Sequence, residues 1–258
     1  MKKHARDFTL YQLEELLTTL KSANVNFITL RDYYISPQTD AVILRHDIDD
    51  RKSHALSFAK IQHQLGIRGT YYFRMVKESF DPEIISQIES LGHEIGYHYE
   101  DMDFAKGDVD RAYELFQSHL KKLRSVANIQ TICMHGSPRS DFDNKSVWDK
   151  YNYKESDILC EPYLDFDFDK LFYLTDTGRM WDGHKYSIRD IIATQRDWPR
   201  FHSTQEIIQS VKGKTFPFPV MFNFHPQRWS NNHYRWTTEL IQQSIKNVFK
   251  AYRKSRLK

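Results

Sequence analysis

Hydrophobic and polar residues follow two different spacings along this chain. Short apolar runs of strand length recur over 26–30, 41–48, 69–74, 94–98 and 131–134. Apolar residues at helical spacing occupy the intervening segments 52–65, 81–91 and 108–126. Strands that alternate with helices in this way predict a parallel sheet with right-handed crossovers.

The rest of the chain is less regular but extends the same pattern. Further apolar runs at 158–159, 172–174 and 220–224 bring the predicted set to about seven strands. The segment 165–169 (DFDFD) alternates strictly, which is typical of an exposed strand or an acidic loop. Parallel strands in a chain of 258 residues favour an α/β barrel.

Helices are also predicted over 203–211 and near both ends of the sequence. The helix over 8–22 carries a leucine stripe, and we expect it to pack on the barrel. We expect the same of the helix over 235–254, whose apolar stripe consists of Leu240, Ile241, Ile245, Val248, Phe249 and Tyr252. No repeat, low-complexity tract or linker divides the sequence, so we predict one domain over 1–258.

Composition excludes several classes of function. With 37 basic and 34 acidic residues, the net charge of +3 does not suggest nucleic-acid binding. Two cysteines make neither a disulfide scaffold nor a cysteine-rich metal site. The first ten residues include no long apolar stretch, so we expect no signal peptide, no membrane span and a cytoplasmic location.

Polar residues of catalytic type gather where the predicted strands end. The strand at 41–48 leads into Asp47 and Asp49, and a period of two places both carboxylates on one side. Similar residues follow later strands: His98 with Glu100, His135 with Arg139, Asp176 with Trp181, and His225 with Arg228 and Trp229. Active sites of such folds lie at this edge of the sheet, which indicates a metal site, a proton-transfer site, or both. The alternative, that Asp49 or Asp50 caps the next helix, explains only one carboxylate.

Three of these segments resemble motifs of the polysaccharide deacetylases with the NodB-homology fold. The segment 92–98, GHEIGYH, is similar to one motif and implies that His98 is a metal ligand. Asp47 and Asp49 resemble the two acidic residues of the family's first motif, which implies that Asp47 is the general base and Asp49 a metal ligand. The segment 220–226, VMFNFHP, is similar to the last motif and implies that His225 is the general acid. The resemblance covers about 42–229 and implies a distorted (β/α) barrel of about seven strands.

The chain departs from this family at the second metal-binding histidine. The family places it four residues after the first, where this chain has Met102, and a thioether is a poor ligand for a zinc-type site. We favour His135 instead, because histidine-rich sites with one carboxylate suit zinc. Glu100, Asp101 and Asp103 are alternative ligands, and a degraded metal site is a further alternative.

The other polar and aromatic residues at the strand ends are expected to bind substrate or to support the catalytic groups. They are Arg45, Glu100, Arg139, Asp176, Trp181, Arg228 and Trp229. Asp176 with Trp181 resembles the family motif that lines the pocket and supports the acid. Arg139 or Arg228 suits a phosphate or uronate, and Trp181 and Trp229 offer stacking faces for a sugar ring.

The resemblance implies a hydrolase that removes an N-acetyl group from an amino sugar with a divalent metal ion, zinc being favoured. Cytoplasmic relatives of this kind take part in surface-polysaccharide or lipopolysaccharide biosynthesis. The implied partner is a nucleotide- or lipid-linked N-acetylated sugar, or an oligosaccharide. Two alternatives stay open: a catalytically silent carbohydrate-binding or assembly protein on the same barrel, and another metal-dependent C–N amide hydrolase.

Overall fold

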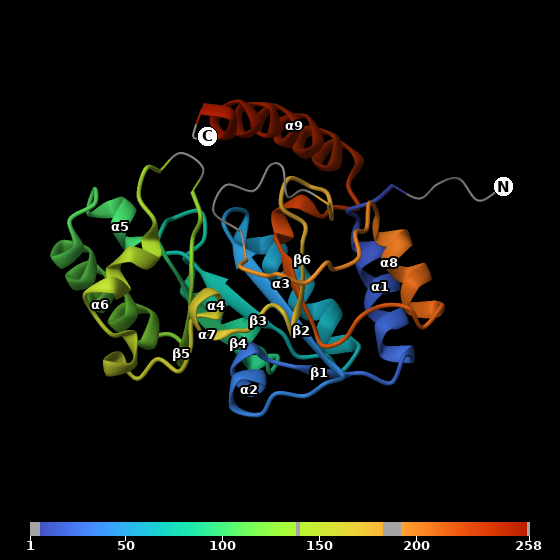
Figure 1. Ribbon diagram of the computed structural model, residues 1–258, viewed down its shortest axis with the longest axis horizontal. Helices are drawn as coiled ribbons and strands as arrows, with labels where there is room; N and C mark the ends of the chain where they lie inside the picture. Colours follow the sequence, from blue (N-terminus) through green and yellow to red (C-terminus); the bar gives the residue numbers. More distant parts are fainter. Residues whose placement is uncertain (1–5, 138–139, 183–191, 257–258) are drawn as a thin grey trace.

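Seven parallel strands form the centre of the computed structural model, which describes residues 6–137, 140–182 and 192–256 (Figure 1). The strands are β1 (Asn26–Ile28), β2 (Ala41–Ile48), β3 (Thr70–Phe73), β4 (Glu94–Tyr99), β5 (Ile129–Met134), β6 (Phe172–Thr175) and β7 (Val220–Phe224). They pair in the order β5-β4-β3-β2-β7-β6, and β1 pairs with the first half of β2. The predicted α/β fold, a distorted barrel of seven parallel strands, is confirmed.

Helices surround this sheet. They are α1 (Leu10–Ser22), α2 (Leu30–Ile35), α3 (Lys52–Gln64), α4 (Pro82–Ser90), α5 (Asp101–Phe104), α6 (Val109–Arg124), α7 (Pro162–Asp165), α8 (Thr204–Lys212) and α9 (His233–Arg256). In Figure 1, α1 and α8 lie together at one side of the barrel, α5 and α6 lie at the other, and α9 crosses its top. Short 3-10 turns, including η4 (Pro226–Arg228), complete the connections.

The alternation of β2 divides its side chains between two apolar clusters. Val42 and Leu44 face the outer cluster, which lies between the sheet and its helices. Ile43 faces the inner cluster, which fills the barrel and also contains Tyr72, Cys133, Tyr173 and Met221 from other strands. The same period of two carries Arg45 and Asp47 toward the inner side, at the end of the strand. Along β2, charged side chains therefore enter the barrel at its mouth.

Most predicted elements are present with small shifts at their ends, and the exceptions have local causes. The run at 158–159 is not a strand: Cys160 makes only an isolated bridge to Thr131. The segment at 165–169 forms the end of α7 and a turn. Asp50 does not cap α3, because its Oδ1 accepts from the N–H of Arg51, the helix's own N-cap residue.

The predicted apolar stripe of the last helix does not pack on the barrel. Ile241, Ile245 and Val248 of α9 are 55%, 66% and 73% exposed, and Leu240 is 39% exposed. The stripe's remaining members, Phe249 and Tyr252, have side chains outside the described set. The helix contacts the rest of the chain through polar residues instead of through the apolar stripe that the sequence shows.

In the described residues, no helix is both long enough and apolar enough to cross a membrane.

His93, which lies in the segment GHEIGYH, has a structural role. Its Nδ1 accepts from the backbone N–H of Gly69 at 3.1 Å, so its Nε2–H donates to the carbonyl of Ala59 at 3.0 Å. Burial lowers the pKa of His93 from 6.5 to about 4. The folded protein therefore keeps this imidazole neutral at pH values where the unfolded chain binds a proton.

We expect the free energy of unfolding to fall as the pH drops from 6.5 toward 4, because the unfolded chain then binds more protons than the folded one. His93 contributes a slope of up to about 1.4 kcal/mol per pH unit in this window. His93→Gln keeps a hydrogen-bond donor for the carbonyl of Ala59. It should reduce the slope of the unfolding free energy against pH by the contribution of one proton. Urea denaturation of both proteins at several pH values measures this, and parallel curves would contradict it.

Candidate active site

The polar residues that follow the strands converge at the mouth of the barrel. Asp47 lies one residue before the end of β2 and Asp49 directly follows that strand. His98 lies near the end of β4, and His135 and His225 follow β5 and β7 directly. His98 Nε2 lies 3.8 Å from Asp47 Oδ2 and 3.5 Å from Asp49 Oδ1. The structure thus brings together five residues that the sequence placed at four different strand ends.

Asp49, His98 and His135 form a group with the geometry of a metal site, and we call them the ligand group. Asp49 Oδ1 lies 3.5 Å from His98 Nε2 and 3.7 Å from His135 Nε2. The three ligand atoms all lie within 4.8 Å of one another. One carboxylate and two imidazoles are donors that suit zinc, and they leave positions open for water or substrate.

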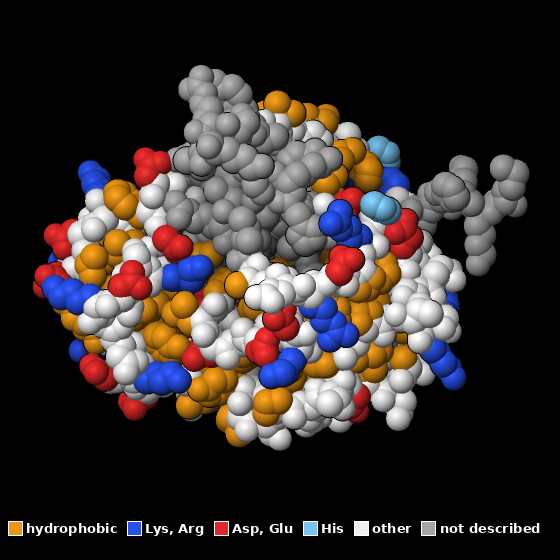
Figure 2. Space-filling model, viewed as in Figure 1, with side chains coloured by type: hydrophobic (Ala, Val, Ile, Leu, Met, Phe, Trp, Pro, Cys, Tyr) orange, Lys and Arg blue, Asp and Glu red, His pale blue; other side chains and the backbone are white. Residues whose placement is uncertain are grey.

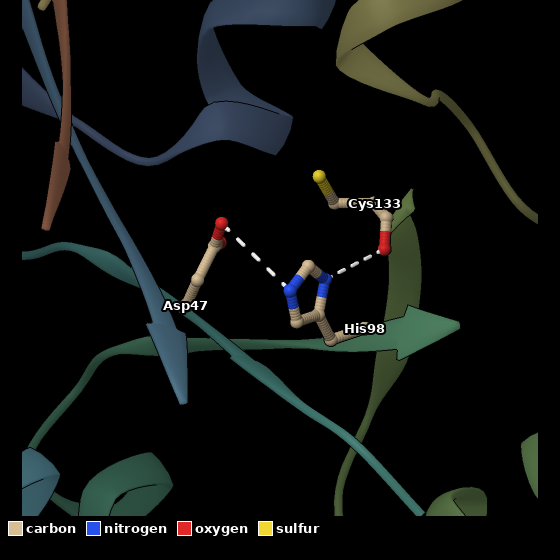
Figure 3. A group of neighbouring side chains, drawn as sticks. All are labelled: Asp47, His98 and Cys133. Atoms are coloured by element: carbon tan, nitrogen blue, oxygen red, sulfur yellow. Dashed lines mark hydrogen bonds and ion pairs between the residues drawn. The ribbon is translucent and has the colours of Figure 1, made fainter. Parts of the chain in front are cut away.

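Hydrogen bonds on the other ring nitrogen orient both imidazoles. The Nδ1–H of His98 donates to the carbonyl of Cys133 at 2.9 Å (Figure 3). His135 Nδ1 lies 2.9 Å from Glu100 Oε2 and donates to this carboxylate. Each bond fixes the tautomer in which Nε2 carries the lone pair, and both lone pairs are available on the side of Asp49. Such outer partners are the usual support of metal-binding histidines.

One carboxylate oxygen of Asp49, Oδ1, is buried without a hydrogen-bond donor among the described residues. Burial raises the pKa of Asp49, but His98, His135 and His225 lower it more, to well below its usual range. A buried, ionised carboxylate with an oxygen that accepts no hydrogen bond is unfavourable unless a positive charge lies beside it. The residues present therefore fit a divalent cation.

Glu100 supports His135 and does not compete for the ion. Arg74 binds its carboxylate through two bonds, from Nε to Oε1 at 2.9 Å and from Nη2 to Oε2 at 2.7 Å. Arg74 also donates from Nη1 to the backbone carbonyl of Asp49 at 3.0 Å, which ties two strand ends together. The sequence interpretation missed Arg74, although it directly follows β3 in the way that the other site residues follow their strands.

The other candidates near Met102 are engaged elsewhere. Met102 is 4% exposed and belongs to the outer apolar cluster. Asp101 binds His119 and the hydroxyl of Tyr97. Asp103 accepts from Ser140 and Asn144. Asp101 and Asp103, which the sequence offered as alternatives to His135, thus have hydrogen-bonding roles, and Met102 has a packing role.

Asp47 lies beside the ligand group and is bound by Arg45. Arg45 donates from Nε to Oδ1 at 2.9 Å and from Nη2 to Oδ2 at 2.7 Å, and Asn223 Nδ2 donates to Oδ2 at 3.1 Å. Burial raises the pKa of Asp47, but Arg45 and His98 lower it more, to about 2. Asp47 is therefore ionised at neutral pH. Asn223 was missed in the sequence, although it lies two residues before His225 and so shares its side of β7.

A second combination of possible ligands, Asp47, His98 and Cys133, shares one histidine with the ligand group (Figure 3). It is the weaker candidate, because Arg45 already neutralises the charge of Asp47. The carbonyl of Cys133, by contrast, has a clear role in orienting His98.

His225 also lies beside the ligand group, with its Nε2 3.8 Å from Asp49 Oδ2. Its Nδ1–H donates to Asp176 Oδ1 at 2.6 Å, and its backbone N–H donates to Oδ2. Asp176 in turn accepts from Arg228 Nη1 and Trp229 Nε1, each at 2.7 Å. Burial raises the pKa of Asp176, but Arg228 and His225 lower it below its usual value. Asp176 thus remains ionised and holds His225 with Nε2 directed at the site.

The aromatic residues that the sequence assigned to sugar stacking lie in the core. Trp181 and Trp229 are 2% and 0% exposed, and their rings pack edge to face with centroids 6.1 Å apart. Trp181 donates from Nε1 to Thr204 Oγ1 at 2.9 Å. Neither ring offers a free face to a ligand, and Trp229 acts only through Asp176. Arg139 lies outside the described residues.

A cavity of about 600 Å³ leads from the ligand group toward α9. Asp49 and His135 form part of its wall, and the rest comes from loops and from one side of α9. Polar residues dominate this wall, among them Arg74, Gln227, Arg228, Gln242, Gln243 and Lys246. Many hydrogen-bond donors around a metal-type group suit a polyhydroxylated or anionic ligand.

Substitution tests which residues hold a metal ion. We expect the wild-type chain to bind about one zinc ion, and His135→Ala or His98→Ala to weaken binding by at least about tenfold. Glu100→Gln should also weaken it, by about 10–100-fold, because it removes the partner that orients His135. Equilibrium dialysis with metal analysis measures each protein.

Met102→Leu is the matched control for the metal titration. Met102 lies in the outer apolar cluster, so this substitution should leave zinc affinity unchanged while keeping the volume of the side chain. Loss of zinc in Met102→Leu, or unchanged affinity in His135→Ala, would contradict the assignment of the ligand group.

No protein-family model matches this chain, and no curated protein matches it. Among solved structures, BA3943, a CE4 family pseudoenzyme from Bacillus anthracis, is similar over 82% of this chain and 63% of its own, with a TM-score of 0.46 and 11% identity. A mutant of BA3943 with restored enzymatic activity has the same coverage and TM-score at 12% identity. PdaA of Bacillus subtilis, a family 4 carbohydrate esterase, has a TM-score of 0.42 and 10% identity over 90% of this chain and 84% of its own. The chain thus spans 63% of the length of the first two structures, and at such identities the functional conclusion has to come from the site itself.

Proposed function

We propose that this protein is a metal-dependent deacetylase that removes an N-acetyl group from an amino sugar in bacterial surface-polysaccharide biosynthesis. The observation that carries the proposal is that two groups suited to proton transfer lie close to the ligand group. Asp47 lies 3.8 Å from His98, and His225, which is paired with Asp176, lies 3.8 Å from Asp49. Hydrolysis of an amide needs a base on one side of the carbonyl and an acid on the other.

Asp49, His98 and His135 would hold the divalent ion. The chemistry that such an ion supplies is polarisation of the amide carbonyl and a lower pKa of a water molecule beside it. The hydrogen bonds of His98 to Cys133 and of His135 to Glu100 keep the two imidazoles in place for this role. Zinc is the proposed metal because the donors are one carboxylate and two imidazoles.

Asp47 has the role of the base. It orients the attacking water and accepts its proton as the new C–O bond forms at the acetyl carbon. Arg45 and Asn223 fix the carboxylate, so its position does not change during the reaction. The low pKa of Asp47, about 2, ensures that it is ionised, although it also makes the carboxylate a weak base.

His225 has the role of the acid. Since its Nδ1–H donates to Asp176, the protonated ring carries its second proton on Nε2, the nitrogen on the side of the ligand group. Transfer of that proton to the amide nitrogen allows the C–N bond to break, which releases acetate and the free amine. Arg228 and Trp229 hold the carboxylate of Asp176 in place, and Asp176 in turn orients the imidazole of His225.

The surroundings of Asp47 support a second candidate function, a carbohydrate-binding protein that holds metal and sugar without hydrolysis. Both oxygens of Asp47 already accept hydrogen bonds from Arg45. A carboxylate bound in this way competes poorly for a water proton. This candidate predicts a protein that binds zinc and an N-acetylated sugar but releases no acetate.

Two substitutions test the deacetylase directly. Asp47→Asn and His225→Ala should each lower kcat for acetate release by about 100-fold or more, because each removes one proton-transfer group. The assay supplies the zinc-loaded protein with N-acetylated sugars that are free, nucleotide-linked or lipid-linked. An unchanged kcat in either variant would refute its assigned role.

His202→Ala is a matched control for His225→Ala. His202 pairs with Asp182 at 2.7 Å, much as His225 pairs with Asp176, but its side chain is 69% exposed. His202→Ala should therefore leave kcat for acetate release unchanged. If the wild-type protein releases acetate from none of the sugars but binds one of them, the binding protein is the correct interpretation. Turnover of other amides alone would instead indicate a different C–N hydrolase.

A further inference from the structure

Helix α9 has its polar residues against the protein and its apolar residues toward solvent, the reverse of an ordinary surface helix. Glu239, Gln243 and Asn247, spaced four residues apart, are buried. On the opposite side, Ile241 and Val248 are more than half exposed. Figure 2 shows hydrophobic side chains along the upper edge of the molecule, where α9 lies in Figure 1.

The attachment of α9 accounts for this orientation. Arg51 forms an ion pair with Glu239 at 3.3 Å, and Asn247 Nδ2 donates to the carbonyl of Gly178 at 2.9 Å. At the start of the helix, Arg179 donates to the carbonyl of Trp236 at 2.7 Å. Because polar contacts of this kind determine which side of α9 faces the barrel, the apolar side is left without a partner in the described residues.

The charge of α9 limits what can cover this face. Its single acidic residue, Glu239, is buried and paired. The basic residues of the same sequence range are His233, Arg235, Lys246, Lys250, Arg253, Lys254 and Arg256. A second copy of the chain, packed on α9 in either direction, would therefore bring only like charges together. A negatively charged surface complements the helix.

We propose that α9 docks the protein on an anionic membrane surface. Ile241, Ile245, Val248 and Tyr234 share one exposed side of the helix and would enter the boundary between headgroups and acyl chains. The exposed basic residues Arg235 and Lys246 would meet the phosphates of the headgroups. A long helix with one apolar side and a basic polar side is the usual form of such an element.

Docking through α9 would also orient the site. The cavity above Asp49 and His135 is lined by Gln242, Gln243 and Lys246 of the same helix, so its entrance would lie next to the lipid surface. If the proposed deacetylase function holds, this position assigns the substrate to the lipid-linked class. The sugar would reach the ligand group from the membrane while its lipid stays in the bilayer.

Vesicle sedimentation tests the docking without any turnover. The wild-type protein should bind vesicles of equal parts phosphatidylcholine and phosphatidylglycerol, and should bind less at high salt and on pure phosphatidylcholine. Ile241→Ser with Val248→Ser should weaken binding by about tenfold or more, since it removes apolar surface from the inserted side. The matched control, Tyr11→Ser with Ile35→Ser, removes comparably exposed apolar residues from α1 and α2 and should bind as wild type does.

The contrary outcomes are distinct. No vesicle binding by the wild-type protein, or equal binding by the α9 double variant, would overturn the proposal. A stable dimer in analytical ultracentrifugation that the α9 double variant dissociates would assign the face to a second copy, and would also overturn it.

A second comparison tests the substrate class alone. The α9 double variant should lose activity on a prenyl-phosphate-linked N-acetyl sugar in vesicles and keep it on the same sugar phosphate in solution. Equal activity ratios in variant and wild type would refute the lipid-linked assignment, whereas absent turnover in both would refute the deacetylase and leave the sedimentation result standing.

Discussion

Buried charge requires a partner, and this requirement organises the mouth of the barrel. Three carboxylates there each bind their own guanidinium: Asp47 with Arg45, Glu100 with Arg74, and Asp176 with Arg228. Asp49 differs, because its carboxylate is paired with no arginine and lies instead beside the imidazoles of His98, His135 and His225. An imidazole is positive only when protonated, so the compensation of Asp49 is incomplete. The site therefore favours a cation beside Asp49, while the other three carboxylates are already neutralised by their arginines.

The same pairing separates residues of similar chemistry into different roles. Glu100 and Asp49 are both carboxylates near His135, but the guanidinium of Arg74 makes Glu100 an outer support. Likewise, Asp47 and Asp49 are two residues apart, and only Asp47 has an arginine. The positions of three arginines therefore decide which carboxylate is left for a metal ion, although none of the three contacts it in the proposed mechanism.

The strand pattern made much of this predictable. Alternation along β2 identified the inward side that Asp47 occupies. The rule that sites form at the carboxyl ends of parallel strands identified His98, His135 and His225 as members of one site. Spacing cannot show pairing across strands, however. Arg74 and Asn223 were missed for that reason. Arg74 binds Glu100, which is 26 positions away in the sequence, and Asn223 binds Asp47, which is 176 positions away.

Sequence by itself determined the α/β barrel, the edge at which the polar groups meet and the residue types available there, because these follow from local periodicity. Only the tertiary structure decided that His135 lies beside Asp49 and His98, that Met102 belongs to the core, and that the two tryptophans are buried, because these facts depend on how distant strands and loops meet. The clearest difference is α9. Its apolar stripe was evident in the sequence, but polar contacts to the barrel, which no periodicity reveals, turned that stripe outward.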